Sequence, residues 1–394
     1  MSEKYWGALN GCAFQDSQTA GRLNNDNDRD LKYECDRIDA VLNPYGMDIF
    51  KFLEDKGIRR QQGLEQVIAA PINYNISNRN RHTLSVVAMA VRLAERLGYN
   101  AKLVQAIGLG HDVGHSILGH VGEEFFAECI YRRELAKAEK NCGAHNPFPQ
   151  KESDCYFAHA CNSIIYAQRV ARKGIGLNIS YEVLCGILDH SASGRDIVAG
   201  NALFHEQAII WLCDPGSYLP NDLGDAHREG YIDLDNLPLC IKKLADGANT
   251  PGCIQNNIRS KIMGAAIKES LQEGYFSFYK CDEAQWFKEM KQWMYKNVYY
   301  NMGKKRENQK NFLPNIYSYV EECYPDYDPL LIMSLMVDWD IEKLVSDMMH
   351  NPGNGLEKYG FHERIIGLPK CREFDFHTYD LDKSHFKIPD LLST

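Results

Sequence analysis

Residues 110–120, GHDVGHSILGH, concentrate side chains that could bind a metal ion or transfer a proton. The stretch holds three histidines and one aspartate, whereas the whole chain of 394 residues has 13 histidines. Imidazole nitrogens and carboxylate oxygens are common ligands of first-row divalent metals. Gly110 and Gly114 flank the pair His111 and Asp112, and glycine permits close approach of the backbone. The stretch therefore predicts a metal site that also has acid–base groups.

Two adjacent ligands do not complete such a site. Neighbouring residues on a regular helix point about 100° apart, so His111 and Asp112 share an ion only near a helix end. Two further candidates are His82, which opens the preceding predicted helix, and Asp214, which follows the apolar run AIIWLC. Taken singly, each has an ordinary structural explanation. Together they predict a site whose ligands converge from several helices.

Apolar residues at helical spacing predict helices over most of the chain after residue 82. The first is HTLSVVAMAVRLAERLG, with a buried face of Leu84, Val87, Val91 and Ala94 and a stop at Gly98. NAKLVQAIGLG follows and runs directly into His111, and VGEEFFAECIYRRELAKAEKN is the third.

Later segments continue the helical pattern. YFAHACNSIIYAQRVARKG should end at Gly174, and SYEVLCGILDHS should begin with Ser180 as its N-cap. LFHEQAIIWLCDPGSYLPNDLGDAHREG should kink or restart at Pro215 and Gly216. Helices are also expected in IQNNIRSKIMGAAIKESLQEG, EAQWFKEMKQWMYKNVYY and PLLIMSLMVDWDIEKLVSDMMHN. Residues 23–30, residues 142–154 and the last twenty or so should be irregular. The fold class is mostly α.

Composition and charge limit the classes of function. The formal net charge of −9 argues against a general nucleic-acid binder but not against a small anionic substrate. None of the 13 cysteines forms a C-x-x-C pair, which favours reduced cysteines in a cytoplasmic protein. The N-terminus lacks the pattern of a signal peptide, and no apolar run approaches the ~18 residues of a membrane span.

The spacing of these motifs resembles that of the deoxyguanosine triphosphate triphosphohydrolase (dGTPase) branch of HD-domain metal phosphohydrolases. RNRHTLSV and HDVGHSILGHVGEE match its R-x-x-H-S/T-L and HD-x-GH-x-x-x-GH-x-x-E patterns, and DPGSYLPNDLGD is similar to its D-x-x-x-Y-x-x-x-D segment. The match covers about residues 60–230. It implies an HD-domain helical bundle with additional C-terminal helices. Residues 1–60 would be an extension on the core, 61–235 the catalytic domain, and 236–394 a helical region completing the pocket or an oligomer interface.

The resemblance implies four metal ligands, His82, His111, Asp112 and Asp214. Two imidazoles and two carboxylates leave positions on an octahedral ion for water and a phosphate oxygen. One divalent ion per site is expected, Mn²⁺ or Mg²⁺, with Fe, Ni, Co and Zn as alternatives.

Four more residues match the family's catalytic groups. His120 and Glu123 correspond to the catalytic histidine and its acidic partner, and a helix would place them on one face. His115 matches the middle histidine of the motif. His159 matches a further active-site histidine, although a histidine buried in a helix is the alternative.

The resemblance also implies substrate-binding residues. Arg79 should contact phosphate as a bidentate donor. Tyr218 and Asp222 should line the sugar pocket, where they would exclude a 2′-hydroxyl, and Gln66 should face the sugar. Bases that could offset the triphosphate charge are Arg259, Lys261 and Lys304, although scattered bases are more often simply solvated.

The chain departs from the family pattern around the pocket. Ser116-Ile117-Leu118 replaces the usual Pro-Pro-Phe, Pro215 and Gly216 follow Asp214, and the loop CGAHNPFPQKE does not align. These changes bear on the expected base preference and on the substrate itself more than on the metal site.

The implied activity is metal-dependent hydrolysis of deoxynucleoside triphosphates (dNTPs), dGTP first, to deoxynucleoside and inorganic triphosphate. Whether His120 protonates the leaving group or assists the nucleophile stays open. One alternative is an HD hydrolase of nucleoside monophosphates or cyclic nucleotides, which usually lacks the second GH-x-x-E element or carries histidines for a second metal. Another is a nucleotide-sensing or single-stranded-DNA-binding protein.

The family implies a homo-oligomer, hexamer or tetramer, with dNTP or single-stranded DNA as effectors and no membrane partner.

Overall fold

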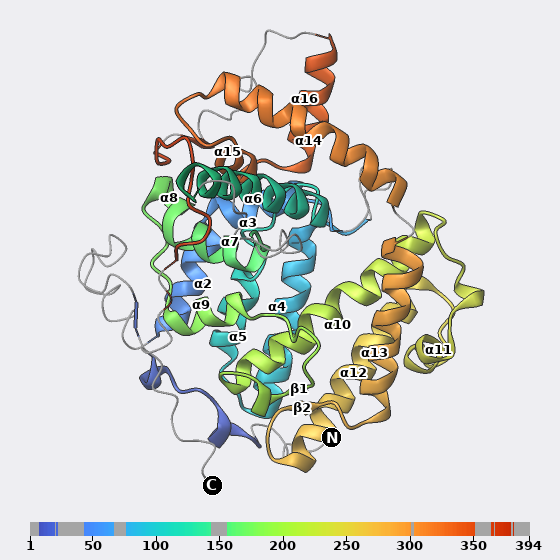
Figure 1. The fold of residues 1–394 in the computed structure, drawn as a ribbon. Coiled ribbons are helices and arrows are strands. Elements are labelled where there is room, and N and C mark those ends of the chain that lie inside the picture. Colours follow the sequence, from blue (N-terminus) through green and yellow to red (C-terminus); the bar gives the residue numbers. More distant parts are fainter. Residues whose placement is uncertain are drawn as a thin grey trace.

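Three helices at the centre of the fold (Figure 1) carry, or lead directly into, the four residues predicted as metal ligands. The structure, a computed structural model, describes residues 8–19, 21–22, 43–66, 76–142, 156–300, 303–350, 364–365, 367–379 and 381. Helix α4 (Arg79–Leu97) packs against α5 (Ala101–Gly110) and α10 (His205–Arg228), and α5 also contacts α10. In the described part of the chain the only sheet is the antiparallel pair β1 (Ile197–Val198) and β2 (Ser277–Phe278). The mostly α class is confirmed.

Helix α4 ends at Gly98 as predicted, but it begins at Arg79, three residues before the predicted start at His82. The side chain of Asn78 accepts a hydrogen bond from the backbone N–H of Arg81, and Gly98 ends the helix with a left-handed φ of 89°. The predicted buried face is wrong in part, because Leu84 is 51% exposed and Val87 and Val91 are only half-buried. α5 and α10 instead cover the face that carries His82, Thr83, Val86, Met89, Ala90, Leu93, Ala94 and Leu97.

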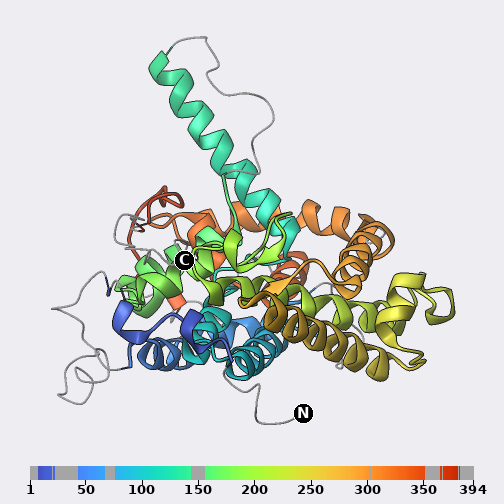
Figure 2. The same ribbon diagram turned by 90° about the horizontal axis from the view of Figure 1, so that it is seen from below.

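Helix α5 is buried along its length and stops at the histidine–aspartate pair, as predicted. Asn100 caps it by accepting from the N–H of Leu103. The chain then turns through residues 111–119 and enters α6 (His120–Cys142), with left-handed φ at Leu118 (55°) and Gly119 (57°). α6 packs on α14 (Gly303–Cys323), and its C-terminal part projects away from the rest of the molecule in Figure 2.

The helix predicted to end at Gly174 is divided. α7 (His159–Ile165) passes into a π-helical turn, Tyr166–Val170, and then α8 (Ala171–Gly174), where Arg172 and Lys173 have left-handed φ. α9 (Tyr181–Leu188) begins after Ser180 as predicted, but the Ser180 hydroxyl has no partner. The N–H of Ser180 donates to Asp48 instead, so tertiary contacts fix this helix start.

Helix α10 excludes one of the two alternatives predicted at Pro215, a new helical segment, whereas a kink there stays a prediction. It is one helix from His205 to Arg228 with Pro215 and Pro220 inside it. It is held between α4 and α12 (Pro251–Glu273). A Cβ on Gly216 would lie 2.9 Å from Ile262 Cδ1 and 3.0 Å from Met89 Cε, so this glycine permits the close packing. Burial against two helices outweighs the lost backbone hydrogen bond of the proline.

The remaining helices surround this centre. α11 (Leu239–Ala245), α12 and α13 (Asp282–Met294) pack together on one side, with the π-helical turn Tyr295–Tyr299 after α13. The helix predicted from Pro329 onward is two, α15 (Pro329–Ser334) and α16 (Asp338–His350), because the Asp340 carboxylate accepts the N–H of Val337 at the break. α2 (Pro44–Glu54) and α3 (Lys56–Arg60) come before α4 in the sequence. Cys142, the first residue of the loop predicted at 142–154, belongs to α6 instead. The rest of that loop, the loop predicted at 23–30 and most of the predicted tail lie outside the described residues.

Buried apolar side chains form a continuous cluster from Leu9 to Phe376 within the described residues. No helix in that part of the chain has the length and apolar character needed to cross a membrane. The three-part domain division stays a prediction.

Candidate active site

The four side chains predicted as metal ligands converge on one point. His82 comes from α4, His111 and Asp112 from the end of α5, and Asp214 from the middle of α10. The Nε2 atoms of His82 and His111 are 3.2 Å apart. Asp112 Oδ2 lies 3.8 Å from His82 Nε2 and 3.5 Å from His111 Nε2. Asp214 Oδ1 lies 3.1 Å and 3.9 Å from the same two atoms.

The donor atoms suit a divalent cation. His111 Nδ1 donates to the carbonyl of Gly108 at 2.8 Å, so the Nε2 lone pair of the neutral ring faces the cluster. Two ligands at right angles, each about 2.1 Å from an ion, lie about 3 Å apart, close to the observed separation of the imidazoles. Two imidazole nitrogens at this distance, with two carboxylates beside them, form a donor set that suits a divalent ion. His82, His111, Asp112 and Asp214 therefore fit the predicted metal.

Burial and charge keep these groups in the protonation states that bind metal. Burial lowers the pKa of His111 to about 4. Burial alone would raise the pKa of Asp112, but His111 and Arg79 outweigh it and hold that pKa well below its usual value. At Asp214 burial is again outweighed, chiefly by the hydrogen bond with His82, and the pKa falls to about 2. At neutral pH the site offers a neutral imidazole and two carboxylates.

Arg79 lies beside the cluster, one turn before His82. Its guanidinium donates to Asp112 Oδ2 at 3.0 Å and to the backbone carbonyl of Gln66 at 3.4 Å. Arg79 Nε and Gln66 Oε1 are buried without a hydrogen-bond partner. Unpaired buried polar atoms are costly, and here they mark where a polar ligand could bind. The guanidinium of Arg79 and the backbone of Gln66, two of the predicted substrate-binding residues, therefore lie together beside the cluster.

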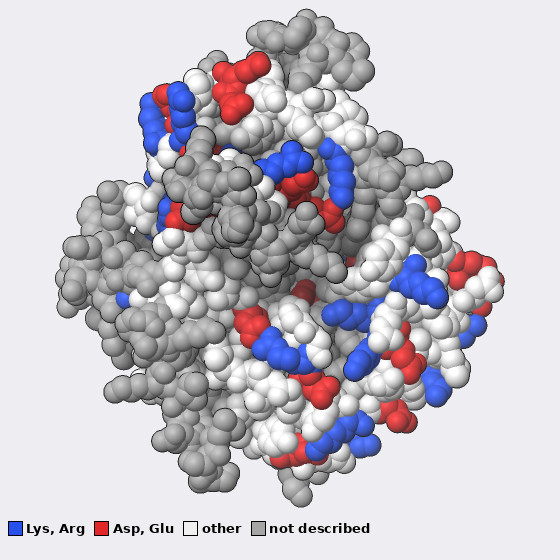
Figure 3. Space-filling view, in the orientation of Figure 1, with Lys and Arg blue, Asp and Glu red and all other residues white. Residues whose placement is uncertain are grey.

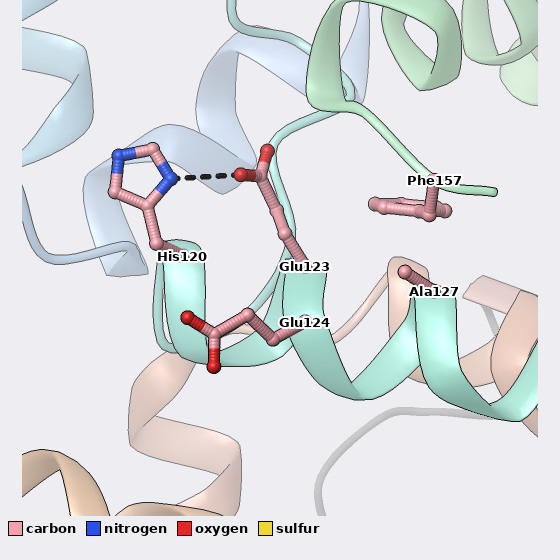
Figure 4. Close-up of a pocket in the computed structure, with 5 residues that line it drawn as sticks. All are labelled: His120, Glu123, Glu124, Ala127 and Phe157. Atoms are coloured by element: carbon pink, nitrogen blue, oxygen red, sulfur yellow. Dashed lines mark hydrogen bonds and ion pairs between the residues drawn. The ribbon is translucent and has the colours of Figure 1, made fainter. Parts of the chain in front are cut away.

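Glu123 joins two of the predicted catalytic histidines. On the first turn of α6, its Oε2 accepts from His120 Nδ1 at 2.8 Å (Figure 4). Its Oε1 accepts from His159 Nδ1 at 2.5 Å and from the His159 N–H at 3.1 Å. Burial lowers the pKa of His159, but the Glu123 carboxylate outweighs it and raises that pKa to about 9. One carboxylate therefore orients two imidazoles.

His120 faces an open pocket. Its side chain is 59% exposed, and the pocket, of about 260 Å³, is lined by His120, Glu123, Glu124, Ala127 and Phe157. Figure 4 shows His120 and Glu123 from the start of α6 on one side and Phe157 on the other. With Nδ1 held by Glu123, His120 Nε2 is the atom that can exchange a proton with a bound molecule.

His115 is enclosed by the other histidines. Its ring stacks on that of His159, with centroids 4.7 Å apart and planes 19° apart, and lies 6.2 Å from that of His120. Burial, followed by the positive charge of Arg79, lowers the pKa of His115 well below its usual value. The neutral ring packs against His159. Its backbone carbonyl accepts from Arg60 at 2.6 Å, which fixes the turn.

Close packing against α7 holds the turn after α5. The Asn162 amide donates to the Gly114 carbonyl at 2.6 Å, and the Ser163 hydroxyl donates to the His111 carbonyl at 3.0 Å. A Cβ on Gly114 would lie 2.2 Å from Ser163 N. The close backbone approach predicted at Gly114 is confirmed. At Gly110 the close neighbours are the side chains of Ile187 and Phe52.

The Ser116-Ile117-Leu118 segment has its own internal bonds. Ser116 Oγ donates to the Gly119 carbonyl at 2.8 Å, and Ile117 is fully buried. The N–H of Leu118 donates to Asp338 Oδ1 at 2.7 Å. Asp338, at the start of α16, therefore positions the segment that leads to His120.

Tyr218 and Asp222 lie one turn apart on α10. The Tyr218 ring centroid is 6.1 Å from that of His82, which places it beside the cluster. Asp222 is 2% exposed and accepts from the Tyr299 hydroxyl at 2.8 Å. Burial raises the pKa of Asp222 well above its usual value. If Asp222 contacts a sugar, its carboxyl group bonds to both the sugar and the Tyr299 hydroxyl.

The candidate bases are dispersed. Arg259 on α12 donates to the Asn221 side chain and, at 3.4 Å, to the Ser217 carbonyl, so it lies against the Tyr218 turn. Lys261 donates to the Lys243 carbonyl at 2.7 Å. The side chain of Lys304 lies outside the described residues.

His190 was missed by the sequence reasoning. It is 5% exposed, its Nδ1 donates to the Ile187 carbonyl at 2.8 Å, and its Nε2 is 3.2 Å from His159 Nε2. Its ring lies 5.3 Å from that of His111. The signal available was the run CGILDH, an apolar helix ending directly in a histidine, as AIGLGH does at His111.

Part of this site falls within a segment of the chain that matches a known family. The family model described as the HD domain matches residues 79–146, so the chain carries an HD domain. It is 28% identical over 211 residues to the deoxyguanosinetriphosphate triphosphohydrolase-like protein of Desulfatibacillum aliphaticivorans, covering 52% of this chain and 54% of that protein. It is 25% identical over 287 residues to the protein of the same name in Clostridium perfringens (strain 13 / Type A), covering 73% and 75%.

A third relative of that name, from Caldanaerobacter subterraneus subsp. tengcongensis, is 29% identical over 205 residues, 52% of this chain and 51% of that protein. The chain therefore spans about half the length of two of these relatives and three quarters of the other. Residues 79–146 thus match the HD domain, and the chain is similar to proteins named deoxyguanosinetriphosphate triphosphohydrolase-like.

Proposed function

We propose that this protein hydrolyses deoxynucleoside triphosphates, with dGTP the first candidate, to a deoxynucleoside and inorganic triphosphate. The observation that carries the proposal is the convergence of His82, His111, Asp112 and Asp214 beside the His120–Glu123 pair. The names of the relatives add support for the substrate class.

The site would bind the α-phosphate between the ion ligands and Arg79. When bound, a divalent ion would polarise a phosphate oxygen and stabilise charge in the transition state. The guanidinium of Arg79, now shared by Asp112 and Gln66, would donate to a phosphate oxygen. Water attacks the α-phosphorus, the bond to the 5′-oxygen breaks, and that oxygen leaves with a proton as the deoxynucleoside hydroxyl.

His120 is the proposed proton carrier. Glu123 holds its Nδ1, and Nε2 would give a proton to the departing 5′-oxygen or assist the attacking water. His159, oriented by the other Glu123 oxygen, and the neutral His115 ring stacked on it would complete the wall of the site.

Tyr218 and Asp222 are the proposed determinants of the sugar. The Tyr218 ring beside His82 would lie under a deoxyribose and exclude a 2′-hydroxyl. Asp222, through the carboxyl it shares with Tyr299, would receive the 3′-hydroxyl, and Gln66 would offer its unpartnered oxygen to the sugar.

One observation favours a second candidate, hydrolysis of nucleoside monophosphates or cyclic nucleotides. HD hydrolases of that kind use additional histidines, and His159 and His190 lie next to the four proposed ligands. The His120–Glu123 element favours the triphosphate, so the monophosphate activity is the runner-up.

The proposed setting is a cytoplasmic homo-oligomer, a hexamer or tetramer, responsive to dNTP or single-stranded DNA. On the face drawn in Figure 3, Lys and Arg side chains of the described residues lie among Asp and Glu side chains. The described residues of that face offer a nucleic acid no continuous basic surface, so we place DNA binding second to catalysis.

The decisive experiment incubates purified protein with Mn²⁺ or Mg²⁺ and each of the four dNTPs, GTP, dGMP and a cyclic nucleotide, and separates the products. Deoxynucleoside with intact triphosphate supports the proposal, and the relative rates identify the base. Turnover of dGMP or the cyclic nucleotide alone would favour the second candidate. Failure to cleave any triphosphate, with metal bound and effectors added, would overturn the proposal.

A further inference from the structure

We infer that Asp338 is a positioning residue of the proposed reaction, because its one carboxylate fixes both the turn that presents His120 and the segment that presents Gln66. This role rests on the proposed function and deepens it, since Asp338 would act through those two side chains. Asp338 is the first residue of α16 and is 2% exposed. It reaches the site from the C-terminal part of the chain.

The carboxylate of Asp338 joins two separate segments. Oδ1 accepts from the N–H of Leu118 at 2.7 Å, and Oδ2 accepts from the N–H of Glu65 at 2.7 Å. Burial raises the pKa of Asp338 to about 6, so the group is mostly a carboxylate at pH 7.5 and both oxygens can accept. Hydrogen bonds to an ionised acceptor are stronger than those between neutral groups. One side chain therefore fixes the distance between the two segments.

The bond to Leu118 acts where the backbone adopts an unusual conformation. Leu118 and Gly119 have left-handed φ of 55° and 57°, and the next residue, His120, begins α6. Glycine adopts this conformation freely, whereas a residue with a side chain rarely does. The bond to Asp338, together with that from Ser116 Oγ to the Gly119 carbonyl, holds the turn in place. The direction in which the chain enters α6 therefore depends on Asp338.

His120 needs such a support because its side chain is 59% exposed. Glu123 orients the ring through Nδ1 at 2.8 Å, and the preceding turn sets where the first residue of α6 lies. Displacement of a reacting group by about 1 Å can cost about 100-fold in rate. A shift of this turn should therefore appear as a loss of kcat.

The bond to Glu65 supports the segment that carries Gln66. On the other side of this segment, the N–H of Arg79 donates to the Leu64 carbonyl at 3.0 Å and its guanidinium donates to the Gln66 carbonyl at 3.4 Å. The segment thus lies between the start of α4 and the start of α16. Loss of the Asp338 carboxylate would remove the contact with α16, so the proposed contact of Gln66 with the sugar should weaken.

Two arginines favour a carboxylate at this place and hold the junction before α16. Arg60 donates to the carbonyl of Met336 at 2.9 Å and to that of His115 at 2.6 Å. The positive charges of Arg79 and Arg60 also favour the ionised form of Asp338. Because the bonds of Arg60 do not involve Asp338, the start of α16 should stay in place when Asp338 is replaced.

The test combines Asp338→Ala with changes at the two residues through which it should act. At pH 7.5 with Mn²⁺ and dGTP, Asp338→Ala should lower kcat by about 10- to 100-fold through misplacement of His120. It should raise KM by about threefold to tenfold through the weakened contact of Gln66, the effect of one neutral hydrogen bond. In His120→Gln the same change should lower kcat by less than about twofold further, and in Gln66→Ala it should raise KM by less than about twofold.

The matched control is Asp328→Ala. Asp328 directly precedes α15, is fully buried and accepts the N–H groups of Leu330 at 2.8 Å and Phe374 at 2.6 Å. Its replacement should lower the stability and leave kcat and KM unchanged. If circular dichroism shows that Asp338→Ala is unfolded, Asp338→Asn replaces it. The single oxygen of the amide keeps one of the two N–H groups, so either kcat or KM should change and the other should not.

Hydrogen–deuterium exchange measured by mass spectrometry provides a readout that is independent of activity. Residues 64–66 and 116–119 should exchange at least about tenfold faster in Asp338→Ala than in the wild type, because their N–H groups lose a buried acceptor. Unchanged exchange and kinetics in a folded variant would overturn the role of Asp338. So would equal kinetic losses in Asp328→Ala, or full losses in both the His120 and Gln66 backgrounds. Wild-type protein that cleaves no triphosphate would overturn the proposed function, and exchange alone would then decide whether Asp338 fixes the two segments.

Discussion

The Glu123 carboxylate holds His159 through two contacts on the same oxygen, at 2.5 Å from Nδ1 and 3.1 Å from the backbone nitrogen. The other oxygen holds His120. The start of α6 and the start of α7 are thus coupled through one side chain. Because the two bonded oxygens are equivalent only in a carboxylate, an amide cannot replace it without losing one histidine.

Replacing Glu123 with Gln should therefore lower kcat by about 10²- to 10⁴-fold, the usual range for loss of a positioned acid–base group. Adding His120→Gln to that variant should cost little more, since both changes disable the same proton transfer. Steady-state kinetics of the two single variants and the double variant measure this. Glu128→Gln, on an exposed part of the same helix, serves as control. Independent, multiplicative losses would show that Glu123 does not act through His120.

Replacing one of the four proposed metal ligands should remove both the bound metal and the activity. His111→Gln and Asp214→Asn each remove a donor that lies within 4 Å of another ligand. We expect the metal content by mass spectrometry to fall together with triphosphate release. His205→Gln, whose histidine contacts Tyr99 at 3.3 Å, should keep both. Activity that survives in His111→Gln would point to a contaminating enzyme.

Two glycine-to-alanine changes should have opposite effects on stability. At Gly114 the new methyl would lie 2.2 Å from Ser163 N and 2.4 Å from the Asn162 carbonyl carbon, so α7 would have to move. We expect a loss of roughly 2 kcal/mol or more in the free energy of unfolding. Gly264 is exposed in α12 with nothing within 4 Å, so its change to alanine should add about 0.5–1 kcal/mol. Denaturant titration of both variants measures the two effects, and equal values would contradict the packing seen at Gly114.

Glu206 should make the protein less stable as the pH rises. It is fully buried, with Oε1 accepting the N–H groups of Phe14 and Asn100 at 2.9 Å and Oε2 unpartnered. Burial raises its pKa from 4.5 to about 7. Between these values the folded state holds a proton that the unfolded state has released, so the free energy of unfolding falls with pH across that window, by roughly 3 kcal/mol at most.

Glu206→Gln keeps an acceptor for both N–H groups and removes the charge. Unfolding by denaturant at pH 5 and pH 8 should therefore show a smaller decrease for the variant than for the wild type. Glu289→Gln, at an exposed position on α13, should leave the decrease as it is. An unchanged pH dependence in Glu206→Gln would mean that Glu206 does not carry this proton.

Tyr218→Ala should reduce discrimination between dGTP and GTP. If the ring excludes the 2′-hydroxyl, its removal should raise kcat/KM for GTP relative to dGTP by about tenfold or more. Tyr300→Ala, at a residue that is 75% exposed, is the control. An unchanged ratio would assign sugar selection to other residues.

The sequence was sufficient for helices that place the proposed metal ligands. α4 and α5 follow from local rules, with an Asn cap at the start and a glycine at the end of each. The continuity of α10 through Pro215 was not predictable, because it depends on packing against α4 and α12, which are distant in sequence. The break before α16 depends similarly on a side-chain contact of Asp340.

The candidate site likewise contains residues that local sequence patterns indicate and residues that only the fold brings together. The four proposed metal ligands belong to spaced sequence motifs, and the fold brings them together as expected. His190 belongs to no quoted motif, and only the fold brings it within 3.2 Å of His159. Asp338, which bonds to the N–H groups of Glu65 and Leu118, was equally beyond a reading of local patterns, because 220 residues separate it from Leu118.

The backbone carbonyls that orient His111 and His190 bear on how the site withstands evolutionary change. Each ring takes its orientation from the last turn of its own helix and not from a neighbouring side chain. Residues around the two histidines can therefore be exchanged over time without altering which nitrogen points inward, provided the helices end in the same place. Such a site tolerates substitutions in its surroundings as long as the ends of the two helices are kept.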